Sequence, residues 1–201
     1  MVKEKQGFGD VIQATLGTTG DSNETVGIEG VYHVECRDAE GNLKWEQDFP
    51  NLVNAVGKQL LLDTLLRTSG TYTTVGPFLG LISGASPTFA ASDTLVTKSW
   101  TEFTDYTVGG SAVRGTAVFG ASSSTGTTPT NVTTSTAAAI TYTITGAGGT
   151  VGGCFLVTGT GAVSTLSNTS GTLYSAGAFA TAKVTTAGDT VAVTYSTTAT
   201  S

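Results

Sequence analysis

The C-terminal half of the sequence is almost free of charge and consists largely of four small residue types. Of the 24 charged side chains in the chain, only Arg114, Lys183 and Asp189 lie in residues 106–201. In the same segment, 67 of 96 residues are Thr, Ser, Gly or Ala. Composition this biased is typical of disordered chains unless a regular apolar pattern runs through it. The spacing of the few larger apolar residues therefore decides what this half can form.

That spacing is typical of short β-strands. Runs rich in Val, Ile, Thr, Tyr and Phe alternate with clusters of Gly, Ser and Asn, which is how strands joined by turns look in a sequence. The clearest runs span 113–119, 140–144, 154–157 and 191–195. Several short strands in series predict a β-sandwich or a jelly-roll-like domain, here over about 75–197.

A β-hairpin is predicted over 28–49. Ile28, Tyr32, Val34 and Cys36 fall on one face of a strand and charged residues fall on the other. Residues 38–42 are rich in turn formers, and apolar and charged residues alternate again from 43 to 49. Strict alternation is a strong strand signal, because successive side chains of a strand point to opposite faces.

One α-helix is predicted, over about 52–67. Asn51 or Asn54 is suited to cap its start, and the run 68–70 contains a glycine that ends it. Its apolar positions recur at helical spacing, and they are Leu52, Val56, Leu60, Leu61 and Leu65. This apolar face is expected to pack against the sheet.

Residues 1–27 show no sustained periodicity and contain five glycines. They are predicted to form an extended N-terminal arm, with residues 28–201 as a single β-rich domain. Four apolar side chains could anchor the arm to a neighbour, and they are Phe8, Val11, Ile12 and Leu16. The predicted fold class is mainly β, with an arm, a hairpin and one helix added to the sandwich or jelly roll.

Charge and hydropathy disfavour several classes of partner. Only 12% of residues are charged, the net charge is -6 and the pI is about 4.6. A nucleic-acid binder or a polybasic membrane binder needs the opposite sign. No apolar stretch follows the N-terminal charges, and the longest aliphatic run is Leu60–Leu62, so neither a signal peptide nor a membrane span is expected. Cys36 and Cys154 are predicted to be buried, reduced thiols.

Few residues could carry catalysis. His33 is the only histidine, and its place on the charged face of a hairpin strand favours a solvated side chain over a catalytic base. Glu102 and Asp105 follow Trp100, which is a weak pattern for glycoside hydrolysis; a polar loop with Trp100 at the edge of the core explains it better. We therefore expect no catalytic, cofactor-binding or metal-binding residues, and a protein that is not an enzyme.

Several segments resemble small virion proteins of tailed bacteriophages. The resemblance covers roughly residues 28–195, and its motifs are structural, so no active-site residues carry over. The similar segments are Tyr32-His33-Val34, Gly41-Asn42-Leu43-Lys44-Trp45-Glu46, 51–62, Gly80-Leu81-Ile82-Ser83, Ser99-Trp100-Thr101-Glu102 and 170–179.

Membership of such a family implies a structural subunit that is assembled into virions in the cytoplasm of the bacterial host. The first expectation is a capsid decoration (cement) protein, whose arm lies along the major capsid protein or other virion proteins. The alternative is a tail-fibre or tail-appendage subunit that meets a host glycan. In both cases self-association is expected. The aromatic residues that would contact a glycan are Trp100, Tyr106, Tyr174 and Phe179.

Overall fold

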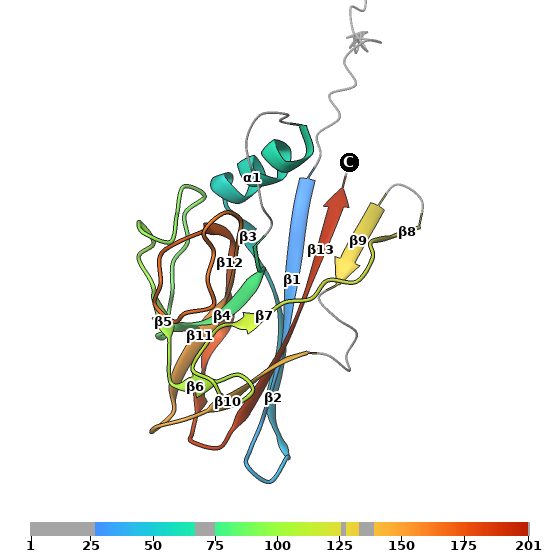
Figure 1. Cartoon of the computed structure of the whole chain (residues 1–201). Coiled ribbons are helices and arrows are strands. Elements are labelled where there is room, and N and C mark those ends of the chain that lie inside the picture. The colour runs from blue at the N-terminus through green and yellow to red at the C-terminus, as the bar shows by residue number, and fades with distance from the viewer. Residues whose placement is uncertain (1–26, 67–74, 126–127, 133–138, 201) are drawn as a thin grey trace, which may run out of the picture.

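The computed structural model describes residues 27–66, 75–125, 128–132 and 139–200. They form a β-sandwich of two antiparallel sheets with one α-helix at one end (Figure 1). The prediction of a mainly β sandwich is confirmed. The predicted arm lies outside the described residues except for Gly27, which begins the first strand. Phe8, Val11, Ile12 and Leu16 therefore lie outside them as well.

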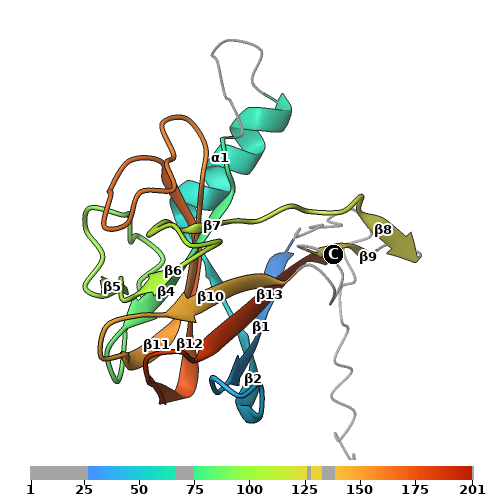
Figure 2. The same ribbon diagram turned by 60° about the horizontal axis from the view of Figure 1, so that its bottom comes forward.

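The first sheet joins the two ends of the described chain. Its strands follow the order β2-β1-β13-β10-β6, with β9 beside β13 and β8 beside β9. The small β8–β9 hairpin projects beyond the sandwich (Figure 2). The strands are β1 (Gly27–Arg37), β2 (Leu43–Pro50), β6 (Tyr106–Thr107), β8 (Ser123–Thr125), β9 (Thr128–Val132), β10 (Ile140–Ile144) and β13 (Thr190–Thr200).

The second sheet contains the longest strand of the described chain. Its order is β3-β12-β11-β4-β5, and β7 also pairs with β4. Within the predicted strand 113–119, only Gly115 and Thr116 belong to a strand. The strands are β3 (Leu52–Val53), β4 (Phe78–Ser83), β5 (Thr101–Phe103), β7 (Gly115–Thr116), β11 (Gly149–Thr158) and β12 (Thr172–Thr185).

The predicted hairpin is confirmed as β1 and β2. Tyr32 lies opposite Phe49 on β2 and opposite Tyr195 on β13, and all three side chains are buried. In the turn, the Asp38 carboxylate accepts a hydrogen bond of 2.8 Å from the Asn42 amide. One boundary was wrong. The sandwich does not begin near residue 75, because the hairpin itself supplies two strands of the first sheet.

The main core lies between the sheets and is rich in aromatic side chains. A second cluster lies on the other face of the second sheet, under the segments 84–100 and 159–171. It contains Ile82, Leu95, Trp100, Phe155, Val157, Ala162, Leu173 and Ala176. Because both faces of the second sheet are covered, β11 is a nearly continuous run of buried residues and does not alternate between buried and exposed positions.

Cys36 and Cys154 are free and buried, as predicted. Burial disfavours the charged thiolate and raises both thiol pKa values, that of Cys36 to about 11.

The helix is shorter than predicted. α1 spans Ala55–Leu66, because Leu52 and Val53 pair with β12 as the short strand β3. Asn54 holds the N-cap position, where its backbone carbonyl accepts the Lys58 amide at 3.0 Å. Its side chain does not cap the helix but donates to the Ala90 carbonyl at 3.1 Å. No helix in the described part of the chain has the length and apolar character needed to cross a membrane.

Candidate functional site

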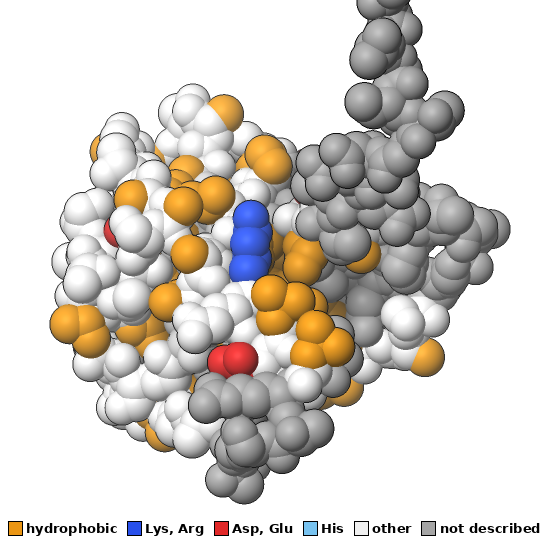
Figure 3. All heavy atoms as spheres, turned by 90° about the horizontal axis from the view of Figure 1, so that it is seen from above, with side chains coloured by type: hydrophobic (Ala, Val, Ile, Leu, Met, Phe, Trp, Pro, Cys, Tyr) orange, Lys and Arg blue, Asp and Glu red, His pale blue; other side chains and the backbone are white. Residues whose placement is uncertain are grey.

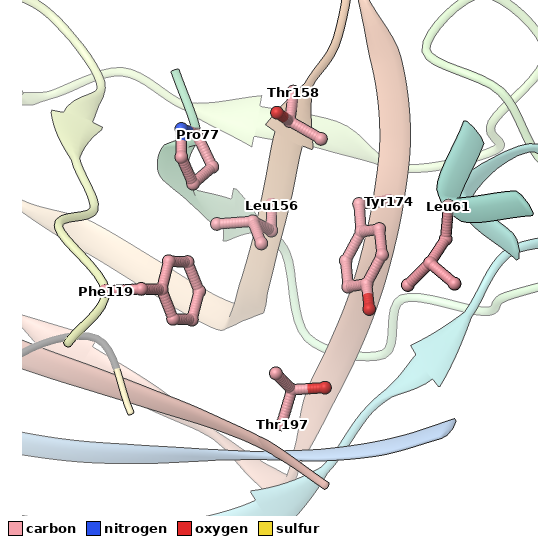
Figure 4. A pocket seen from close by; sticks show the side chains of 7 residues that line it. All are labelled: Leu61, Pro77, Phe119, Leu156, Thr158, Tyr174 and Thr197. Atoms are coloured by element: carbon pink, nitrogen blue, oxygen red, sulfur yellow. The ribbon is translucent and has the colours of Figure 1, made fainter. Parts of the chain in front are cut away.

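An apolar groove opens between the two sheets at the end of the sandwich that carries α1 (Figure 4). Its volume is about 390 Å³. Side chains from the helix, from both sheets and from two connecting segments surround a common space. They are Leu61, Pro77, Phe119, Leu156, Thr158, Tyr174 and Thr197. We call this the apolar groove.

A β-bulge places Tyr174 in the groove. Leu156 pairs with Ser175 and the next residue, Val157, pairs with Leu173, so Tyr174 is an extra residue on β12. A bulge of this kind re-aims side chains. Ser175 consequently points into the core, where its hydroxyl lies 3.0 Å from that of Tyr32, while Tyr174 packs against the same core from the groove. Partial burial raises the pKa of Tyr174, and a hydrogen bond with Thr197 opposes that rise.

Gly57 sets the distance between α1 and the groove. A Cβ atom at Gly57 would lie 2.5 Å from the carbonyl oxygen of Tyr174 and 2.9 Å from its Cα. That carbonyl also accepts the backbone amide of Asn54 at 2.9 Å. The first turns of the helix therefore rest directly on the β12 backbone, and this contact holds Leu61 at the groove.

Four exposed apolar side chains belong to the same helix or connecting segments as residues that line the groove. Leu62 is 56% exposed and Leu66, one helical turn later, is 76% exposed. Val75 and Val118, which lie close in sequence to Pro77 and Phe119, are 37% and 62% exposed. Seen from this end, hydrophobic side chains gather around a single basic side chain (Figure 3). We call these four residues the apolar rim.

The rim is not among the features predicted from the sequence, although the sequence carries a signal for it. Leu60, Leu61, Leu62 and Leu66 are spread around the helix and do not form one stripe. A helix that is apolar on several sides needs more than one apolar neighbour. In the structure, β12 covers only part of this surface, because Leu60 and Leu61 are half-buried and the other two leucines are exposed.

The four aromatic residues predicted to contact a glycan do not form one surface. Tyr106 is 1% exposed and Phe179 is 6% exposed, and both belong to the main core. Their rings pack on other aromatic rings: Tyr106 on Tyr142 and Phe179 on Phe49. The expectation that these two rings stack on a sugar is wrong for this structure, since their faces are covered. Of the four, only Tyr174 lines the apolar groove.

Trp100 is also covered, which agrees with its predicted place at the edge of the core. It is 5% exposed, its ring centroid lies 5.0 Å from that of Phe155, and Phe89 packs on it edge-on. The Lys98 ammonium lies 5.0 Å from the ring centroid. One edge of Trp100 borders a small polar pocket lined mainly by Ser and Thr hydroxyls.

The carboxylate of Glu102 serves a buried ion pair. Arg114 binds it with two hydrogen bonds, of 2.9 and 2.7 Å, and the two side chains are 1% and 3% exposed. The same carboxylate accepts the Ser167 amide at 2.7 Å, and Arg114 donates to the Asn168 carbonyl at 2.7 Å. Glu102 therefore attaches the 159–171 segment to β5, whereas Asp105 is exposed. The structure therefore does not bring Glu102 and Asp105 together in a shared site.

His33 lies on the outer face of β1, as predicted. Its Nδ1 is 2.6 Å from an Asp48 carboxylate oxygen, and its Nε2 is 3.6 Å from Glu35. The hydrogen bond to Asp48 raises the pKa of His33 above 6.5, although partial burial acts in the opposite direction. The imidazolium form is therefore the one stabilised in the folded protein.

We expect this pKa shift to be directly measurable, because the chain has a single histidine. An NMR titration of the imidazole should give a midpoint above 6.5, and D48N should lower it. The control variant, E40Q, also removes one negative charge, but from the β1–β2 turn, and it should leave the midpoint unchanged. The folded-state pKa is raised, so the small stabilisation is present below pH 6.5 and is lost as the pH rises through the folded-state value. A wild-type midpoint at or below 6.5 would contradict the assigned contact.

Among the residues that the structure describes, no group of three or more His, Cys, Asp or Glu side chains is arranged to hold a metal ion. Comparison with known proteins adds no relative: no family model, no curated protein and no solved structure matches the chain.

Proposed function

We propose that this chain is a structural subunit of a tailed-bacteriophage particle, and that it acts as a capsid decoration protein. The apolar rim is the observation that carries the proposal. Leu62 and Leu66 are exposed on α1, the helix that also supplies Leu61 to the groove. Exposed apolar patches on a folded domain are typical of protein–protein contact sites.

The rest of the chemistry agrees with repeated weak attachment. The chain has few charged residues, so neighbouring copies on a shell repel one another weakly. One core cluster lies between the two sheets of the sandwich, and the resemblance to small virion proteins falls on these same elements. In the proposed mechanism, each copy buries the apolar rim against a coat subunit, and the contact is repeated over the shell.

Copy number per particle tests this function. Quantitative mass spectrometry of purified particles should find the chain at a simple ratio to the major coat protein, such as one to one or one to three. The double variant L62S/L66S should lower that ratio. Two leucines contribute roughly 3 kcal/mol or more when buried, which corresponds to about a hundredfold loss of affinity.

V184S is the matched control, because Val184 is 65% exposed and lies on β12, away from the groove. It should be incorporated like the wild type. All three side chains are largely exposed in the free chain, so each variant should lose no more than about 1 kcal/mol of stability, the cost of serine in a helix or strand. A few to a few tens of copies per particle would mean a tail component, and absence from purified particles would overturn the virion assignment altogether.

A further inference from the structure

The apolar groove has the properties of a site that something fills. Five of its seven lining residues are hydrophobic, and its volume is about 390 Å³. At roughly 30 Å³ per molecule, such a space holds about a dozen waters. Water there has few polar partners, because the lining offers two threonine hydroxyls and one tyrosine hydroxyl. An apolar occupant is therefore favoured over solvent.

The chain itself carries a matching segment. Residues 8–16 contain Phe8, Val11, Ile12 and Leu16 and only one charged residue, Asp10. Four of these nine residues carry large apolar side chains, which could fill an apolar groove. This is the densest apolar segment before the first strand of the sandwich.

The point at which the described chain begins lies beside the groove. Gly27 pairs with Thr200, and the groove residue Thr197 pairs with Gly30. The groove is thus three residues along β1 from Gly27, a distance of about 10 Å. Ten residues separate Leu16 from Gly27, and a chain of that length reaches up to about 35 Å. Gly17 and Gly20 lie in this connection and permit a reversal of direction.

We propose that residues 8–16 of the chain's own N-terminal segment bind in the apolar groove of the free protein. The short connection gives this segment an effective concentration on the order of millimolar, so it outcompetes a second copy under dilute conditions. The bound segment covers Phe119, Leu156 and Tyr174 and leaves the outer face of α1 open. This inference concerns the free protein and does not rest on the virion assignment, which the copy number tests separately.

Paramagnetic broadening in NMR spectra of the full chain tests the proposal. A nitroxide attached to A14C reports on residues near the bound segment, and Cys36 and Cys154 do not compete for the label because they are buried. The amide signals of Leu156, Tyr174 and Thr197 should lose most of their intensity. The signals of the β1–β2 turn, at the opposite end of the sandwich (Figure 1), should keep theirs.

Two sets of controls separate the outcomes. Adding F8S and I12S to the labelled chain should restore the groove signals, whereas V2S, the same kind of change outside the segment, should not. In a mixture of spin-labelled chains and isotope-labelled chains without a nitroxide, the groove signals should stay sharp. Broadening in that mixture would assign the groove to a second copy's segment and overturn the proposal. Sharp groove signals in the singly labelled chain, or broadening that survives F8S/I12S, would also overturn it.

Discussion

R114A is expected to lower the free energy of unfolding by about 3–5 kcal/mol, the range measured when one partner of a buried ion pair is removed. Both side chains of the Arg114–Glu102 pair are almost completely buried. The substitution leaves the Glu102 carboxylate without its cation in a region of low dielectric. It also removes the donor to the Asn168 carbonyl. For a chain of this size, the melting temperature should fall by roughly 6–20 °C.

The control for R114A is R37A. Arg37 also pairs with a glutamate, Glu35, at 3.2 Å, but its side chain is 46% exposed. An exposed pair contributes at most about 1 kcal/mol, so R37A should melt close to the wild type. The double variant R114M/E102L should be more stable than R114A, because it leaves no buried charge unpaired. Thermal melts of all four proteins check this, and equal losses for R114A and R37A would contradict the buried pair.

G57V should destabilise the protein by about 1–3 kcal/mol and should disturb the groove. Helix propensity alone predicts the reverse, since Val is more favourable than Gly inside a helix. A side chain at position 57 would overlap the carbonyl oxygen and Cα of Tyr174. Backbone atoms of a central strand cannot rotate away, so α1 must shift outward, and overpacking of this kind costs about 1–3 kcal/mol. Urea unfolding measures the loss.

T64V is the matched control for G57V. It places the same side chain on the exposed side of the same helix, where Thr64 bonds only to the Leu60 carbonyl, and its effect should stay within about 0.5 kcal/mol. The amide signals of Leu61 and Tyr174 should shift in G57V and not in T64V. A G57V protein as stable as the wild type would contradict the close contact between helix and sheet.

Local patterns were sufficient for the elements themselves. The alternation of Tyr32, Val34 and Cys36 permits only one face of β1 to be buried, and the structure buries that face. The sequence also predicted the single helix, the buried thiols and the sandwich. These features depend on the period of the apolar residues, which each segment carries independently of the rest of the chain.

The candidate site could not be predicted in this way. The tail-fibre alternative predicts that Tyr174 contacts a glycan, but a one-residue bulge in its pairing with β11 turns it into the groove. The sequence offers Glu102 and Asp105 as a weak catalytic pair, but the charged partner of Glu102 is Arg114. The sequence places Leu52 in the helix, but its pairing with β12 makes it a strand residue. Each outcome depends on a partner that no local pattern specifies.

By itself, the sequence determined which residues form strands and a helix and which faces of them are apolar, because side-chain periodicity and turn residues act over a few positions. The tertiary structure alone decided that β1 pairs with β13 from the other end of the chain. It also decided that α1 rests on β12 through Gly57, and that the groove opens beside the start of β1. Strand register and the packing distance between elements depend on contacts between segments that are far apart in the sequence. These contacts contribute to stability only in the folded chain, so no local pattern predicts them.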